Sequence, residues 1–206
     1  MIEELHSITI ILIAVNALVS LSAFSDQRVF TALLFEPFTI NARGQWYRFI
    51  THAFIHANWP HLLVNMFVLF MFGKEVEEAY SHLKPSGSLS YIIMYLGAIL
   101  FSSLPGYKKY VHDPTYRAVG ASGAVSAILF SYILIFPVES LDLMFLPFDV
   151  PAYIIGICYL FYSWYMDRYG DDNIAHDAHF YGAIFGILFT ATLEFDLITD
   201  FGGFQR

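Results

Sequence analysis

The sequence predicts an all-α membrane protein with six transmembrane helices and a structured first loop. Of its 206 residues, 57% are hydrophobic and 14% are charged, whereas soluble domains have roughly 45–50% apolar and about 25% charged residues. The charged residues leave six neutral windows, and a helix needs about 17–25 mostly apolar residues to cross a ~30 Å hydrocarbon core. These windows are residues 5–25, 49–73, 85–107, 118–138, 150–166 and 178–193.

The windows and the segments between them predict different roles. Window 5–25 lacks the cationic start and small-residue cleavage site of a secretory signal, so we expect it to be retained as the first helix. Segment 26–59 is too long for a tight turn, and its Trp46, Tyr47 and Trp59 suit a membrane interface. Windows 150–166 and 178–193 are at or just below the length limit, so we expect these spans to be shielded by neighbours or to cross a thinned bilayer. Residues 1–206 are expected to form a single membrane domain.

Composition excludes several partners and cofactors. The formal charge of -8 leaves no basic surface to neutralise a phosphate backbone, which excludes nucleic acid as a main partner. Cys158 is the single cysteine, so the chain has no internal disulfide and no thiolate cluster for zinc. Eight histidines make a metal-dependent hydrolase one alternative, but only His61 and His179 are well placed, and no His-Glu-x-x-His site is present. We therefore expect no metal and no other cofactor.

Polar side chains gather at the start of the second, fourth and sixth spans. Such groups are costly inside a membrane and are functional candidates by default. Even-numbered spans run in the same direction, so the three clusters start from the same face of the bilayer. Their members are His52, His56, Asn58, His61 and Asn65, then Gly120, Ala121, Ser122 and Gly123, then His176, Asp177 and His179.

Ser122 and His179 meet the chemical minimum for nucleophilic catalysis. Ser122 begins a helix, where free backbone N–H groups can stabilise an oxyanion, and an imidazole can accept the serine proton. Stripes of small residues allow the fourth and sixth helices to approach closely, which would bring the two side chains together. Asp177 is two residues from His179, on a different helical face, so we expect a dyad with Asp177 solvated. The stripes are Gly120, Gly123, Ala124, Ala127 and Ser131, and Ala178, Gly182, Ala183 and Gly186.

His61 and Asn65 are four residues apart and share one face of the second helix. Their side-chain donors suit an oxyanion hole, in which each donor supplies a few kcal/mol of transition-state stabilisation. His52 and His56 precede this helix and are expected to be structural, bonded to the backbone of the first loop. A structural role is also favoured for His176.

At this point the motifs resemble those of the rhomboid intramembrane serine proteases. Trp46, Arg48, His52 and His56, followed by His61 and Asn65, resemble the loop and second-helix signature of that family. Gly120-Ala121-Ser122-Gly123 is similar to its nucleophile motif, and His179, Gly182 and Gly186 resemble its His-x-x-Gly-x-x-x-Gly helix. Together the motifs span about 140 of the 206 residues in the expected order.

The resemblance implies Ser122 as nucleophile, His179 as general base and then acid, and an oxyanion hole made of Asn65, His61 and the Ser122 backbone amide. It implies structural support from Arg48 and Glu77, which would help to hold the first loop and the second helix. It also implies that the loop from Arg168 to Ala175 acts as a cap. One departure is visible: some bacterial members place a tyrosine on the catalytic histidine four residues after the nucleophile, where this sequence has Ser126. The supporting residues are Arg48, His56, Glu77, Gly120, Gly123, Gly182 and Gly186.

Two arguments on orientation disagree. With six spans, the face opposite the termini carries more cations, and the positive-inside rule would make that face cytoplasmic. The family's six-helix form implies the reverse, with cytoplasmic termini and a site that opens outward, in a plasma or bacterial inner membrane. We adopt the second orientation because Arg48 belongs to a structured loop. The two sets are Lys74, Lys84 and Arg206 on the terminal face, and Arg28, Arg43, Arg48, Lys108, Lys109, Arg117 and Arg168 on the other.

The function that these residues predict is an intramembrane serine endopeptidase. Its partners would be transmembrane protein substrates, whose helices must unwind before cleavage, and the lipid bilayer; the sequence leaves the oligomeric state open. The alternative is a catalytically silent membrane chaperone or scaffold that binds client helices, which would need neither Ser122 nor His179.

Overall fold

The computed structural model describes residues 7–141, 149–170, 172 and 174–199. Helices dominate this part of the chain, with one short antiparallel strand pair that joins Ser140 to Pro151 and Leu141 to Val150. In chain order the elements are α1 (Ile8–Ser25), α2 (Gln27–Leu33), α3 (Pro37–Arg43), α4 (Arg48–Thr51), the 3-10 helix η2 (His52–Phe54), α5 (Trp59–Leu83), α6 (Gly87–Tyr110), α7 (Ser122–Ile135), β1 (Ser140–Leu141), β2 (Val150–Pro151), α8 (Ala152–Tyr169), α9 (His176–Leu193) and α10 (Asp196–Thr199).

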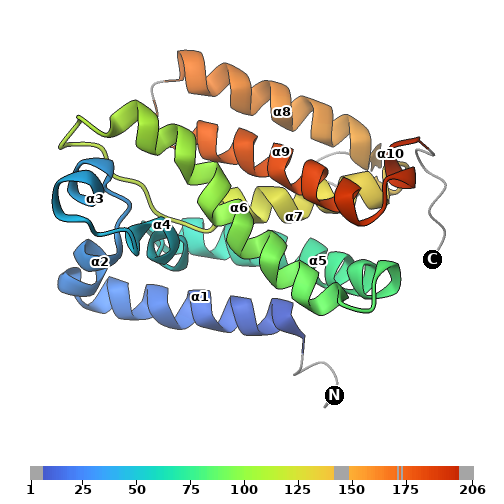
Figure 1. The fold of residues 1–206 in the computed structure, drawn as a ribbon, viewed down its shortest axis with the longest axis horizontal. Helices are drawn as coiled ribbons and strands as arrows, with labels where there is room; N and C mark the ends of the chain where they lie inside the picture. Colours follow the sequence, from blue (N-terminus) through green and yellow to red (C-terminus); the bar gives the residue numbers. More distant parts are fainter. Residues whose placement is uncertain (1–6, 142–148, 171, 173, 200–206) are drawn as a thin grey trace.

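The helix α7 forms the centre of the bundle. All of its residues except Ser122 and Leu129 are buried, as expected for a helix that is apolar on every side. It packs against α5, α6 and, most extensively, α9. Figure 1 shows α1 on one side of this group and α8 on the opposite side. The start of α1 and the end of α9 lie at one end of the bundle, while α2, α3 and α4 lie toward the other.

Each of the six predicted windows overlaps a helix, but the bounds of windows 49–73 and 118–138 are wrong. The chain turns by 94° between α4–η2 and α5, so α5 begins about ten residues later than window 49–73. Asn58 caps it by accepting a hydrogen bond from the His61 N–H (2.9 Å), and Pro60 occupies its first turn. The first loop, expected to be structured, contains α2, α3, α4 and η2.

Window 118–138 contains a shorter helix than expected. α7 has 14 residues and is therefore about 21 Å long at 1.5 Å per residue. The preceding segment is extended and is tied to the first loop by paired hydrogen bonds between Phe35 and Ala118, each 3.0 Å long. Because this segment takes the place of a first helical turn, α7 begins inside the bundle rather than at its edge.

Length and composition identify fewer spans than the six predicted. Among the described residues, α1 and α6 are long and apolar enough to cross a membrane, and the bent pair of α4–η2 with α5 would make a third span. Large apolar side chains are nevertheless exposed along the outer helices, as a lipid environment permits; examples are Leu18, Phe67 and Ile157. The count of six crossings stays a prediction.

A buried polar cluster joins three helices of the core. The Tyr80 hydroxyl of α5 lies 2.6 Å from the Thr190 hydroxyl of α9, which donates to the Ser131 hydroxyl of α7 (2.8 Å). Ser131 in turn donates to the carbonyl of Ala127, one turn earlier (2.9 Å). Because these groups satisfy one another, the cluster fixes the relative positions of α5, α7 and α9 without leaving buried polar atoms unpaired.

Candidate active site

Gly120 lies immediately before α7 and allows the chain to turn into this helix. Its N–H donates to the His52 carbonyl (2.9 Å), and its φ of +112° lies in a region that L side chains rarely adopt. A Cβ atom here would lie 2.6 Å from Cε1 and 2.7 Å from Nε2 of His61. Glycine is therefore required both by the backbone conformation and by the His61 ring, and Ser122 follows as the first residue of the helix.

Backbone-to-backbone contact between α7 and α9 aligns the helices that carry the predicted nucleophile and base. A Cβ on Gly182 would collide with the Gly123 carbonyl, and one on Gly186 would collide with the Ala127 carbonyl. The Cβ position of Gly123 is 3.4 Å from the Ala178 carbonyl. Gly123 follows Ser122 and Ala178 precedes His179, so the small-residue stripes align the first turns of the two helices.

A small cavity lies beside the start of α7. Its volume is about 20 Å³, enough for about one water molecule. Ser122, Gly123 and Ala178 line it, together with His52 and Ser102. In the described part of the chain no hydrogen bond joins the Ser122 hydroxyl to His179; hydrogen bonds of this kind commonly tighten only when substrate binds.

His179 lies in the first turn of α9 between two rings. The Tyr159 ring of α8 is nearly parallel to it, with ring centres 6.3 Å apart and planes 25° apart. The His176 ring meets it edge-on at 5.8 Å. Tyr159 is absent from the predicted site residues, because window 150–166 holds several tyrosines; its one distinguishing signal is Gly156, three residues earlier.

Asp177 is buried, so the expectation that it is solvated is wrong. One carboxylate oxygen accepts the Ala178 N–H (2.8 Å), while the other has no hydrogen-bond partner among the described residues. This second oxygen lies 3.5 Å from the Cβ position of Gly106 on α6. The carboxylate therefore faces α6, and no hydrogen bond connects it to His179 in the described residues.

His61 presents one ring nitrogen to the start of α7. Its Nδ1 accepts the Ala57 N–H (3.5 Å), which leaves the proton of a neutral ring on Nε2, the nitrogen that faces Gly120. Asn65, one turn later, is buried and donates one N–H to the His61 carbonyl (2.8 Å). The second N–H of this amide remains for another acceptor.

Arg48 organises the first loop from within. Its guanidinium donates to the carbonyls of Thr31 (3.0 Å) and Leu34 (2.7 Å) and to the Gln45 side chain (2.7 Å), and it pairs with Glu36 at 3.4 Å. Four partners on three segments make this residue a structural centre of the loop.

His52 bonds the backbone of the first loop, as expected, whereas His56 bonds a side chain of α1 instead. His52 uses Nδ1 to bond the Arg48 carbonyl (2.9 Å). The Nδ1 of His56 bonds the Ser20 hydroxyl of α1 (2.9 Å), and its ring meets that of His61 edge-on at 5.0 Å. His56 therefore connects α1 to the oxyanion-hole candidate.

Glu77 holds the second helix, α5, as the resemblance implied, but it does so through α1 and not through the first loop. Its carboxylate accepts hydrogen bonds from the Ser7 hydroxyl (2.7 Å), the Ile8 N–H (2.8 Å), and the Thr9 N–H and hydroxyl (3.0 and 2.8 Å). It lies about 27 Å along α5 from the helix start, far from the first loop. The carboxylate instead caps the N-terminus of α1.

The loop that the resemblance treats as a cap is described in part, because residues 171 and 173 lie outside the described residues. His176 lies 3.1 Å from the Asp172 carboxylate, and this hydrogen bond holds the pKa of Asp172 below its usual range. Among the described residues, no group of three histidine, cysteine or acidic side chains is arranged to hold a metal ion.

Comparison with known proteins supplies the family. The Rhomboid domain matches residues 43–194. RHOMBOID-like protein 12, mitochondrial, of Arabidopsis thaliana is 32% identical over 149 residues, which cover 68% of this chain and 44% of the relative. Rhomboid-like protein 11, chloroplastic, of the same plant is 41% identical over 90 residues, covering 44% of this chain and 29% of the relative.

A bacterial relative bears the name of an enzyme. Rhomboid protease GlpG of Haemophilus influenzae is 30% identical over 132 residues, which cover 62% of each chain. The present chain spans less than half of the length of the two plant relatives. The domain match covers most of the chain and includes every motif from Arg48 to Gly186; with its apolar helices, this chain therefore belongs to the rhomboid family of integral membrane proteins.

Proposed function

We propose that the protein is an intramembrane serine endopeptidase with Ser122 as nucleophile and His179 as base. The observation that carries the proposal is the backbone contact of Gly123 with Ala178 and Gly182, which sets the first turns of α7 and α9 against each other. Relatives named as proteases, including Rhomboid protease AarA of Providencia stuartii, support this class of activity.

The reaction needs one nucleophile and one proton carrier. The Ser122 hydroxyl oxygen attacks the carbonyl carbon of the scissile peptide bond, and His179 takes the hydroxyl proton. When the tetrahedral intermediate collapses, the C–N bond breaks and His179 returns the proton to the leaving amine. A water molecule, deprotonated by the same imidazole, then hydrolyses the acyl-enzyme ester and regenerates the serine. The cavity beside Ser122 has the size required for that water.

Three groups would donate to the oxyanion. The Ser122 N–H is among the first of its helix and so lacks an intrahelical partner. The Nε2–H of His61 faces Gly120, and Asn65 keeps one free N–H. An oxyanion-hole donor of this kind contributes about 2.7–4 kcal/mol of transition-state stabilisation.

The substrates proposed are transmembrane segments of other proteins. Each helical peptide bond has its carbonyl engaged, so a segment must unwind before the carbonyl reaches Ser122. Segments with small or helix-breaking residues should therefore be cleaved fastest.

The proposed orientation has both termini in the cytoplasm and the site open to the outside. Part of the cation excess on the site face is neutralised, because Arg48 and Arg117 both pair with Glu36 and Lys109 pairs with Asp167. A fluorescent protein fused after Arg206 should be bright, and alkaline phosphatase at the same place should be inactive; the reverse pattern would refute the orientation. The relatives include mitochondrial and chloroplastic proteins, so they lend no support to the expected plasma or bacterial inner membrane.

The decisive test is cleavage of a single-span substrate in liposomes, with fluorophosphonate labelling in parallel. We expect the parent protein to cleave and to be labelled, Ser122→Ala to lose both, and His179→Ala to fall by several orders of magnitude. Labelling that survives Ser122→Ala would remove the nucleophile assignment. Client binding without any cleavage by the parent protein would favour the scaffold alternative.

A further inference from the structure

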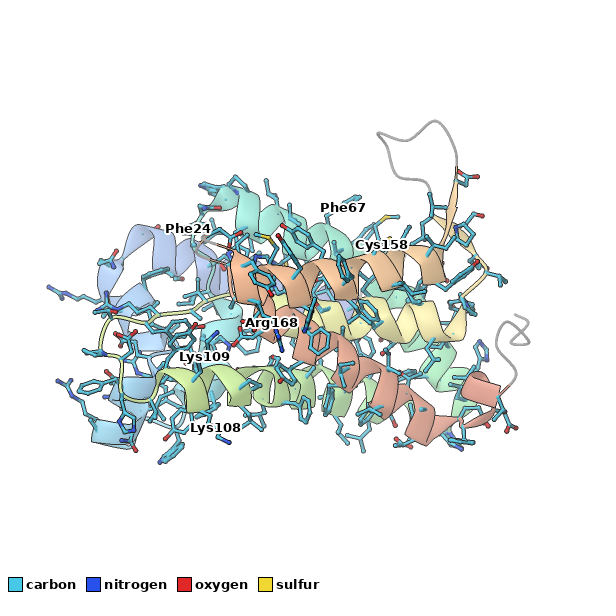
Figure 2. All side chains as sticks on the ribbon, turned by 90° about the horizontal axis from the view of Figure 1, so that it is seen from above. Phe24, Phe67, Lys108, Lys109, Cys158 and Arg168 are labelled. Atoms are coloured by element: carbon cyan, nitrogen blue, oxygen red, sulfur yellow. The ribbon has the colours of Figure 1, made fainter. Side chains whose placement is uncertain are left out.

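α8 supplies an aromatic ring to His179. The Tyr159 and His179 rings are nearly parallel at 6.3 Å and 25°, within the range in which stacked rings attract one another. The tyrosine comes from a peripheral helix, since the buried residues of α8 are Ala152, Gly156 and Ser163. Figure 2, seen from above, shows α8 lying over α7 and α9. The ring contact therefore reaches across a helix boundary to the proposed base.

Packing against α7 fixes the register of Tyr159. One turn earlier on α8, the Cβ position of Gly156 is 3.1 Å from the Ile133 side chain and 3.4 Å from that of Phe130. The Tyr159 ring also contacts Phe130, with ring centres 5.6 Å apart. Because the backbone of α8 approaches α7 closely at the glycine, the next inward side chain projects toward the start of α7 and α9.

The hydroxyl of Tyr159 is anchored on the nucleophile helix. It lies 2.7 Å from the hydroxyl of Ser126. Ser122 and Ser126 are four residues apart and share one face of α7, so the anchor lies one turn from the proposed nucleophile. One side chain thus bonds the helix that carries the nucleophile and stacks on the base.

The polar surroundings leave the His179 ring without another anchor. Within the described residues no side chain hydrogen-bonds the imidazole. The Asp177 carboxylate faces α6, and that of Asp172 bonds His176. The remaining ring contact of His179 is the edge-on contact with His176. This contact does not cover the face of the His179 ring, so it does not fix the plane of that ring.

We propose that Tyr159 is a positioning residue for His179: its ring holds the imidazole plane toward Ser122, and its bond to Ser126 holds the ring. This rests on the proposed peptidase function. Ser126 and Tyr159 act as one unit. In it, a tyrosine on α8 takes the place of the tyrosine that some bacterial members carry on the helix of the nucleophile. The unit adds no reacting group. It restricts the imidazole to the orientations in which it can accept the serine proton.

The test compares Tyr159→Leu with Tyr165→Leu in the full chain in liposomes. Tyr165 lies on the same helix but is exposed, and its ring contacts those of Phe161 and Tyr169, so its loss removes an equal ring away from the site. We expect Tyr159→Leu to lower kcat by about 10- to 100-fold, with KM within about twofold of the parent. Equal kcat values for the two leucine variants, with an active parent, would overturn the proposal.

The anchor is tested by a double-mutant cycle. Tyr159→Phe keeps the ring and should recover most of the activity lost in Tyr159→Leu, leaving kcat about two- to tenfold below the parent. Ser126→Ala should reproduce this smaller loss, and the double variant Ser126→Ala with Tyr159→Phe should be no slower than either single variant. Additive losses would overturn the role of the hydrogen bond.

A spectroscopic experiment tests the contact between Tyr159 and His179 independently of the proposed peptidase activity. In histidine-labelled protein in detergent, the imidazole signals of His179 are identified by their absence in His179→Gln. The face of the Tyr159 ring shields them, so Tyr159→Leu should move them downfield and Tyr165→Leu should not. Unmoved signals would overturn the ring contact. A parent protein that neither cleaves nor labels, but whose signals move as expected, would refute the peptidase function and support the contact.

Discussion

The interface between α7 and α9, which we call the seam, is held together in a different way from the contact of α1 with its neighbours. At the seam, glycines place backbone on backbone beside Ser122 and His179. α1 is instead held by long-range side-chain hydrogen bonds, in which Glu77 caps its N-terminus and Asn16 donates to the Tyr95 hydroxyl (3.1 Å). Backbone contact has almost no freedom to relax, whereas side chains adjust their rotamers. We therefore expect the seam to control the catalytic geometry. The contacts of α1 should mainly affect the stability of the fold.

Gly182→Ala should have the largest effect, because its new methyl group would collide with the Gly123 carbonyl. We expect kcat to fall by about 100-fold as the two first turns separate, and the free energy of unfolding to fall by about 1–3 kcal/mol. Substrate cleavage and thermal unfolding measure the two quantities. The matched control is Gly97→Ala, where the methyl meets the tip of the Phe185 ring (2.8 Å), which can move. If both variants kept parental kcat, the seam would not set the geometry.

Gly120→Ala should have an intermediate effect. The new Cβ would strain a φ of +112° and push the His61 ring away from the oxyanion position. We expect fluorophosphonate labelling of Ser122 to slow by about tenfold or more. Gly44→Ala is the control, since its φ is also positive (+65°) but no atom lies within 4 Å of the Cβ position. Gly44→Ala should lower the stability of the protein without slowing the labelling of Ser122. Slower labelling of Gly44→Ala would contradict the role given to the His61 ring.

Glu77→Gln should have the smallest effect on catalysis. The amide has one acceptor oxygen where the carboxylate has two, so buried donors at the start of α1 lose partners, at a cost of about 1–3 kcal/mol in the free energy of unfolding. kcat at a temperature where the variant is folded should stay within about twofold of the parent. Glu78→Gln, on the exposed face of the same helix, should change stability by less than about 0.5 kcal/mol. A fall in kcat as large as that of Gly182→Ala would place α1 in the catalytic machinery.

The sequence predicted the helices better than their ends. Charges and apolar runs act locally, so each neutral window overlaps a helix. Window 49–73 failed at its start because Asn58 and Pro60 favour a helix that begins there. Window 118–138 failed because the paired bonds between Phe35 and Ala118 hold the chain extended. Such a contact between distant segments leaves no periodic signal in either.

The sequence by itself determined the residue types of the site: a serine flanked by glycines, a histidine ahead of a glycine pair, and a His-Asn pair on one helical face. These depend on spacing along a single helix, which a 3.6-residue repeat fixes. Tertiary structure alone decided that Tyr159 stacks on His179, that Asp177 faces α6, and that Glu77 caps α1. Each of these depends on which faces of different helices meet, and that is set by the packing of the whole bundle rather than by any local pattern.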